Sequence, residues 1–166
     1  MEVEVVRSAR RRKTVSARPV DGVLRISIPA TMSRAEEARW VGEMSRRFER
    51  RARSDGIDLV ARAATLARRH GLPRPTSIRW VDDQRTRWGS CTPADGSIRI
   101  STRVAGYPTW VVDHVVVHEL AHLVEAGHGP RFQALLARDP KAERAIGFLM
   151  AKGMDGEAPD DGADLP

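Results

Sequence analysis

The segment His118-Glu119-Leu120-Ala121-His122 has residue types and a spacing that suit a catalytic metal ion. Residues four apart lie on one face of a helix, about one turn apart, so His118 and His122 can reach the same ion. A zinc ion with three protein ligands lowers the pKa of its water to about 7, and a neighbouring Glu can accept the proton as this water attacks a carbonyl. The pattern therefore predicts a zinc hydrolase site with Glu119 as the general base.

Two further histidines compete for the third ligand position: His114, four residues before His118, and His128, six residues after His122. On one helix, His114 and His122 would lie about 12 Å apart along the axis, whereas a Zn–N bond is only about 2.1 Å long. His128 avoids this difficulty, because Gly127 lets the chain leave the helix and fold back. We predict that His118, His122 and His128 hold one zinc ion per chain, while His114 packs beside the site or orients a group near it.

The residues around the motif predict the helix that carries it. Pro108 suits the first turn of this helix, and Gly127 suits its exit. Apolar residues recur at helical spacing and make an apolar face: Val111, Val112, Val115, Val116, Leu120, Leu123 and Val124.

The first part of the chain is expected to be β-rich and then helical. Asp21-Gly22 is a favourable hairpin turn, and Ser33 with Glu36 predicts a capping box at the start of a helix. Gly71 is expected to stop the second helix. The expected elements are strands near 2–6, 13–18 and 23–28 within residues 1–30, and helices over 33–53 and 57–70 within residues 33–71.

The catalytic core is expected over residues 76–137. A turn at 93–96 separates the last two strands of a small sheet, and two short helices follow the metal site. The expected strands lie near 78–80, 85–91 and 98–100, and the helices over 129–138 and 140–151. The predicted fold class is α+β and zincin-like: a small antiparallel sheet packs on an active-site helix, with an N-terminal β-hairpin region and further helices. We expect one domain over residues 1–152 and an acidic, disordered tail over 153–166.

Composition narrows the class of protein. The chain of 166 residues has one cysteine, Cys91, so it has no internal disulfide. It has no run of 18 apolar residues, and its first residues do not resemble a secretory signal. These features predict a cytoplasmic protein without a membrane span.

The net charge is +6, and since residues 153–166 hold five acids and no Lys or Arg, residues 1–152 carry +11. That charge suits either a solvated basic surface or binding to nucleic acid.

Beyond the histidine motif, several segments resemble the YgjP-like metallopeptidases, a zincin family related to SprT-like and WLM proteins. The resemblance covers about residues 5–137 and is densest over 85–132. The matching residues are Ser8, Arg10 and Lys13, Arg87-Trp88-Gly89-Ser90-Cys91, Ser97-Ile98-Arg99-Ile100, Pro108, Val115-Val116-Val117-His118-Glu119-Leu120-Ala121-His122-Leu123, His128 and Arg131-Phe132.

The resemblance implies a zincin fold, with zinc on His118, His122 and His128 and Glu119 as general base. The chain departs from the family at two positions. Many relatives carry an aromatic residue, often Tyr, where His114 stands, and often Trp where Gln133 stands. These changes concern packing beside the site and substrate preference rather than ligand chemistry.

The Trp88-Gly89-Ser90-Cys91 segment has two interpretations. It could form an edge strand facing the cleft, to which the substrate backbone adds, with Gly89 permitting close backbone approach and Cys91 capping the zinc. Alternatively, Trp88 and Cys91 are core residues and Gly89 forms a bulge. Trp110 and Phe132 are expected in the core.

A peptidase also needs a donor for the oxyanion that forms during hydrolysis. The candidates in the dense region are Tyr107, His114, Arg87 and Arg131. Spacing alone does not choose among them.

The leading hypothesis is a zinc-dependent metallopeptidase that acts on peptides or proteins. The alternative is a nucleic-acid-associated protein, either a SprT-like protease or a basic zinc-binding module acting at DNA, and steep salt dependence of DNA binding would support it. A metal-binding scaffold without activity is a third possibility. Glu119 argues against the scaffold, because a structural zinc site normally uses four protein ligands and needs no such carboxylate.

Overall fold

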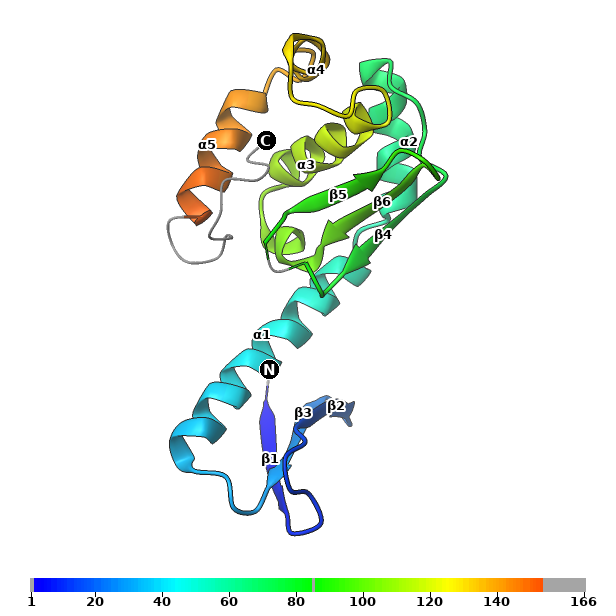
Figure 1. Cartoon of the computed structure of the whole chain (residues 1–166). Helices are drawn as coiled ribbons and strands as arrows, with labels where there is room; N and C mark the ends of the chain where they lie inside the picture. Colours follow the sequence, from blue (N-terminus) through cyan, green and yellow to red (C-terminus); the bar gives the residue numbers. More distant parts are fainter. Residues whose placement is uncertain (1, 85, 154–166) are drawn as a thin grey trace. The chain divides into compact units, whose positions relative to one another are not determined.

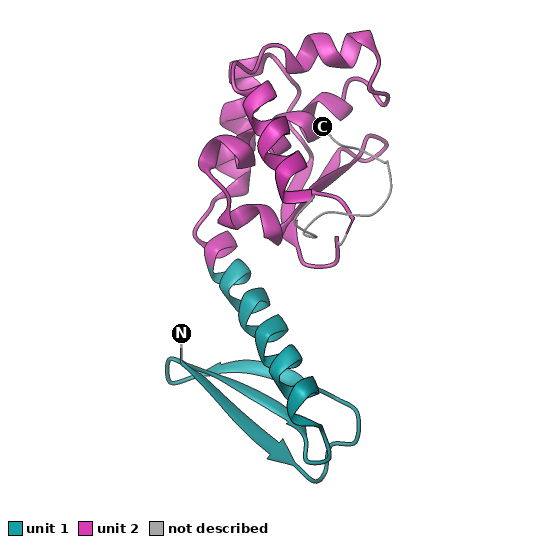
Figure 2. Cartoon of the chain, turned by 90° about the vertical axis from the view of Figure 1, so that its left-hand side faces the viewer, with its two compact units in different colours: residues 1–52 teal, residues 53–166 magenta. Residues whose placement is uncertain are grey.

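The computed structural model describes residues 2–84 and 86–153. The chain divides into two compact units, residues 1–52 and residues 53–166 (Figure 2). The expectation of one domain over 1–152 stays a prediction, and the expected disordered tail lies, from residue 154 on, outside the described residues.

The first unit is a three-stranded sheet covered by a helix (Figure 1). Its strands lie in the order β1-β3-β2, with β3 parallel to β1 and antiparallel to β2. Asp21 and Gly22 join β2 to β3 with φ values of 51° and 82°, as a type I′ hairpin turn requires, which confirms the predicted turn. The elements are β1 (Val3–Ser8), β2 (Ser16–Val20), β3 (Val23–Pro29) and α1 (Arg34–Asp55).

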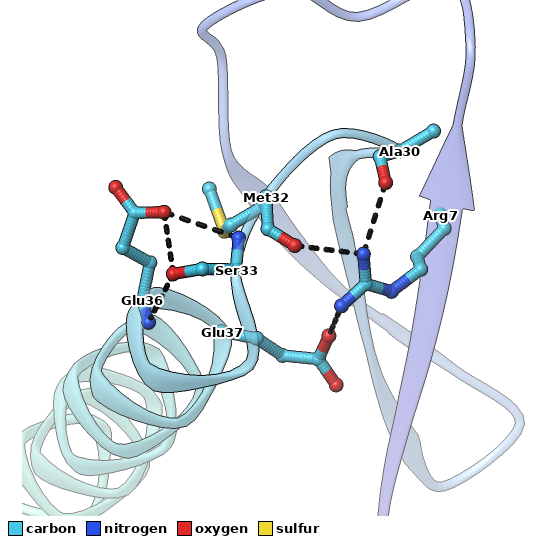
Figure 3. Close-up of polar contacts among 6 residues, drawn as sticks. All are labelled: Arg7, Ala30, Met32, Ser33, Glu36 and Glu37. Atoms are coloured by element: carbon cyan, nitrogen blue, oxygen red, sulfur yellow. Dashed lines mark hydrogen bonds and ion pairs between the residues drawn. The ribbon is translucent and has the colours of Figure 1, made fainter.

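The start of α1 is held by the predicted capping box (Figure 3). The Glu36 backbone N–H donates to Ser33 Oγ at 3.2 Å, and the Ser33 N–H donates to Glu36 Oε2 at 3.1 Å. Arg7 of β1 donates to the carbonyl oxygens of Ala30 and Met32 at 3.0 and 2.8 Å and pairs with Glu37. These contacts tie the loop before α1 to the sheet. Inside the unit, α1 residues Val41, Met44 and Phe48 pack on Leu24, Ile26 and Ile28 of β3.

The second unit packs a sheet and three α-helices around a central helix, α3. Its sheet has the order β4-β6-β5 (Figure 1). The elements are α2 (Leu59–His70), β4 (Ser77–Val81), β5 (Gly89–Thr92), β6 (Ser97–Ser101), the 3₁₀ helix η1 (Thr102–Gly106), α3 (Thr109–His122), α4 (Pro130–Leu136) and α5 (Ala142–Lys152).

The α+β fold class is confirmed, but the predicted antiparallel sheet is mixed. β5 and β6 are antiparallel across the predicted turn, whereas β4 runs parallel to β6 on its other side. In the sheet, β5 therefore lies on the opposite side of β6 from β4. Alternating apolar and polar residues have the same period of two in both kinds of strand pair, so the pattern did not reveal the direction of β4.

The metal helix α3 is buried on most of its surface. Ten of its 14 residues are buried, and it contacts β5, β6, α2, α4 and α5. A helix that is apolar on all sides belongs in a core, so the single apolar face predicted from sequence was too narrow. The prediction that the helix extends toward Gly127 was wrong: α3 ends at His122, and Val124, assigned to its apolar face, is 51% exposed.

The two caps of α2 match their sequence signals. Gly71 adopts a left-handed φ of 65° and ends the helix as predicted. At the other end, Asp58 Oδ1 accepts a hydrogen bond of 2.9 Å from the Ala61 N–H.

Among the described residues, no helix combines the length and apolar character needed to cross a bilayer. The cytoplasmic location stays a prediction.

Replacing Asp58 with Ala removes the N-cap of α2, and we expect it to lower the free energy of unfolding by about 1 kcal/mol. Asp58→Asn keeps a capping oxygen and serves as the control. Urea denaturation followed by far-UV circular dichroism measures both. An Ala variant as stable as the Asn variant would show that this cap contributes nothing.

Candidate metal centre

The residues of the histidine motif line a cleft of about 260 Å³ in the second unit. Its lining includes residues 87–91, which are the first three residues of β5 and the two residues before it. His118, Glu119 and His122 of α3 line the cleft as well, together with Ala126 and His128. The cleft thus brings together the edge strand of the sheet and the motif-bearing helix.

Three histidine rings point their Nε2 atoms at one another. The Nε2 of His118 lies 3.1 Å from that of His122 and 3.3 Å from that of His128. Two nitrogens bound at 2.0–2.1 Å to a tetrahedral zinc ion would lie roughly 3.3–3.4 Å apart. Among the described residues, these three form a group with the spacing of a metal site. The donor set therefore fits a zinc ion with one coordination position left open.

The chain beyond α3 turns back at once, which brings His128 to the other two rings. The Leu123 and Val124 N–H groups donate to the Leu120 and Ala121 carbonyls at 3.2 and 3.0 Å and close the turn. Gly127 does not have a left-handed φ, so its expected role as a helix exit is not observed. The turn also places the Glu125 carbonyl 3.0 Å from His122 Nδ1. With the proton on Nδ1, the lone pair of the His122 ring lies on Nε2, the atom that faces His118.

Phe132 of α4 supports all three rings. Its ring centroid lies 4.9 Å from that of His118, 4.5 Å from His122 and 4.7 Å from His128, and the residue is fully buried. The expected core position of Phe132 is confirmed, but its contact with the histidines was missed. Its position four residues after His128, on a predicted helix, was the available signal.

Burial keeps His118 in the form that binds metals. Its side chain is almost inaccessible, and desolvation, followed by the neighbouring His122 and His128, lowers its pKa to about 2. The imidazole is therefore neutral at pH 7, with a lone pair available for coordination.

Glu119 lies against the backbone of β5. It is 5% exposed, and a Cβ placed on Gly89 would fall 2.5 Å from Glu119 Oε1 and 2.9 Å from its Cδ. Gly89 pairs with Ile100 in regular antiparallel register, so the bulge considered for this residue is absent. Gly89 is required here because any side chain would overlap the carboxylate.

Trp88 and Cys91 both pack in the core and both line the cleft, while capping of the metal by Cys91 stays a prediction. Trp88 is 4% exposed and belongs to the core, and it also lines the cleft. Cys91 is half-buried on β5, packs against the same core and lines the cleft. Burial, with a smaller contribution from Glu119, raises the pKa of the Cys91 thiol to about 11.

The four candidate oxyanion donors occupy different surroundings. Arg87 lines the cleft. Tyr107 packs edge to face on Trp88 with ring centroids 5.6 Å apart. The Arg131 side chain is 87% exposed beside Glu125. His114 is fully buried and pairs with Asp139, and burial lowers its pKa. Among these four candidate donors, Arg87 is therefore the residue that lines the cleft containing the histidine motif.

Over about half of its length, the chain shares its fold with a known peptidase structure. The metallopeptidase zymogen of Pyrococcus abyssi abylysin has a TM-score of 0.50 and 20% identity, over 55% of this chain and 91% of that one. The metallopeptidase zymogen of Methanocaldococcus jannaschii jannalysin has a TM-score of 0.49 and 14% identity, over 60% of this chain and 97% of that one. No curated protein has significant sequence similarity to the chain.

The model of the YgjP-like metallopeptidase domain matches residues 27–145, which is more than half of the chain. The matched range includes the motif helix, the edge strand and all three clustered histidines. The chain belongs to the YgjP-like metallopeptidase family.

Proposed function

We propose that the chain is a zinc-dependent peptidase in which His118, His122 and His128 hold the metal and Glu119 is the general base. The observation that carries the proposal is the convergence of the three Nε2 atoms at 3.1 and 3.3 Å. Three protein ligands leave a coordination position for water, as in catalytic zinc sites, whereas structural sites normally use a fourth protein ligand.

The residues divide the chemistry between them. When bound, zinc supplies a Lewis acid that acidifies water and polarises the scissile carbonyl. Glu119 accepts the proton of the attacking water and passes it to the leaving amine. Its burial beside Gly89 holds the carboxylate in one place. Arg87, from the cleft wall, is the proposed donor to the oxyanion.

The edge strand β5 suits an extended peptide. In the sheet, β5 pairs with β6 on one side, and Gly89, Ser90 and Cys91 line the cleft. The free edge of a strand offers backbone N–H and C=O groups that can pair with a substrate backbone. The metallopeptidase family implies peptide or protein substrates, and β-strand addition is the proposed binding mode.

The nucleic-acid-associated alternative rests on the charge of the chain. The net charge of +6 suits a solvated surface equally well. No contact among the described residues and no comparison with known proteins supports binding to nucleic acid, so we do not propose this alternative.

Replacing Glu119 with Gln keeps the size of the side chain but removes the proton acceptor. We expect zinc to remain bound at one ion per chain and peptide hydrolysis to fall by roughly 10²–10⁴-fold. Elemental analysis measures the zinc, and mass spectrometry of new N-termini in a lysate treated with each protein measures hydrolysis. An equally active Gln variant would exclude Glu119 as the base.

Replacing His128 with Ala should weaken zinc binding by more than about 100-fold, because it removes a direct ligand. His114→Ala should weaken binding less. Competition with a chelating dye gives both dissociation constants. The opposite ranking would refute the assignment of His128 as the third ligand.

Gly89→Ala should displace the Glu119 carboxylate, since the new Cβ would lie 2.5 Å from Oε1. We expect kcat to fall by about 100-fold with little change in zinc content. Gly147→Ala in α5 is the matched control, because a Cβ there meets nothing within 4 Å. Equal kcat values for the two variants would show that the close approach does not position Glu119.

A further inference from the structure

His114 and Asp139 form a buried pair next to the candidate metal centre. His114 is 0% exposed and lies one helical turn before His118 on α3. Its Nδ1 is 3.2 Å from Asp139 Oδ2, and the Asp139 side chain is 11% exposed. The other carboxylate oxygen, Oδ1, accepts a hydrogen bond of 3.0 Å from the Lys141 N–H. Asp139 is therefore held with one oxygen facing His114.

These contacts determine which nitrogen of each ring carries hydrogen. The Asp139 carboxylate accepts, so His114 Nδ1 carries the hydrogen and its Nε2 has a free lone pair. His118 directs its Nε2 toward His122 and His128, so its own hydrogen lies on Nδ1. His114 Nε2 is thus an acceptor, and His118 Nδ1 is a donor.

The donor and the acceptor are both buried, and neither has a hydrogen-bond partner among residues 2–84 and 86–153, which the structure describes. Residues four apart on a helix share a face, with their side chains about 5–6 Å apart at Cβ. Buried polar groups without partners are costly, and a complementary pair on neighbouring turns is their simplest resolution. A rotation of one ring, or one water molecule between the two rings, would complete this hydrogen bond.

We propose that Asp139, His114 and His118 form a hydrogen-bonded relay to the metal, in which His118 Nδ1–H donates to His114 Nε2 directly or through one water molecule. The relay rests on the proposed role of His118 as a metal ligand. It fixes the orientation of the His118 ring and makes His118 Nε2 a stronger ligand. His114 and Asp139 are positioning residues that act on the metal through His118.

Three variants separate this relay from a structural tie between α3 and the segment after α4. His114→Leu fills the space but has no acceptor for His118. His114→Gln retains both a donor for Asp139 and an acceptor for His118. In Asp139→Asn, Lys141 holds the amide oxygen, so the amide NH₂ faces His114 and reverses its hydrogen-bonding roles.

We expect His114→Leu and Asp139→Asn to weaken zinc binding by about 10–100-fold, measured by competition with a chelating dye. His114→Gln should restore the dissociation constant to within a few-fold of the parent. Zinc affinities unchanged within twofold in His114→Leu and Asp139→Asn, with only the unfolding temperature lowered, would overturn the relay.

Nitrogen-15 NMR of the zinc-loaded parent tests the relay without substitution. We expect a slowly exchanging proton on His118 Nδ1 and an unprotonated His114 Nε2. A proton on His114 Nε2 would overturn it. A parent that binds no zinc, or a His118→Ala variant that binds as tightly as the parent, would refute the proposed metal site itself. Zinc bound through His118 but insensitive to His114 would refute the relay alone.

Discussion

The proposed metal site requires three imidazole nitrogens to lie within a few ångströms of one another. The packing of the second unit meets this requirement. His118 and His122 rise from one face of α3, and the turn after the helix returns His128 to them. A tetrahedral ion accepts only small errors in ligand position, so the helix that carries two of the three proposed ligands has to be rigid. Burial of α3 among the sheet and three helices provides that rigidity.

The groups that pack around the three histidine rings have positions as well defined as those of the rings. Phe132 touches all three from α4, and the Glu125 carbonyl orients His122. Side chains locked by their neighbours lose little entropy when a ligand binds, which favours a preformed site. The short segment from His122 to Phe132 therefore supplies two of the three proposed ligands, an orienting carbonyl and an aromatic support.

The contact of Gly89 with Glu119 links strand β5 of the sheet to the proposed general base. Because β5 passes directly over the carboxylate, the strand proposed to hold the substrate and the group proposed to move the proton share one fixed distance. The register of β5 on β6 sets that distance. A slip of one residue would replace the glycine with a side chain and would reverse the faces of the strand.

Local signals in the sequence were sufficient for several features that depend on neighbouring residues, although the exit predicted at Gly127 was wrong. Spacing of four placed His118 and His122 on one helical face, and the capping box at Ser33 and the turn at Asp21-Gly22 formed as predicted. The tertiary structure alone decided the parallel direction of β4, the aromatic support from Phe132 and the pairing of His114 with Asp139. These features depend on packing between segments that are distant in the chain. Hydrophobic periodicity and secondary-structure propensity describe only the local conformation of one segment, so they do not predict such packing.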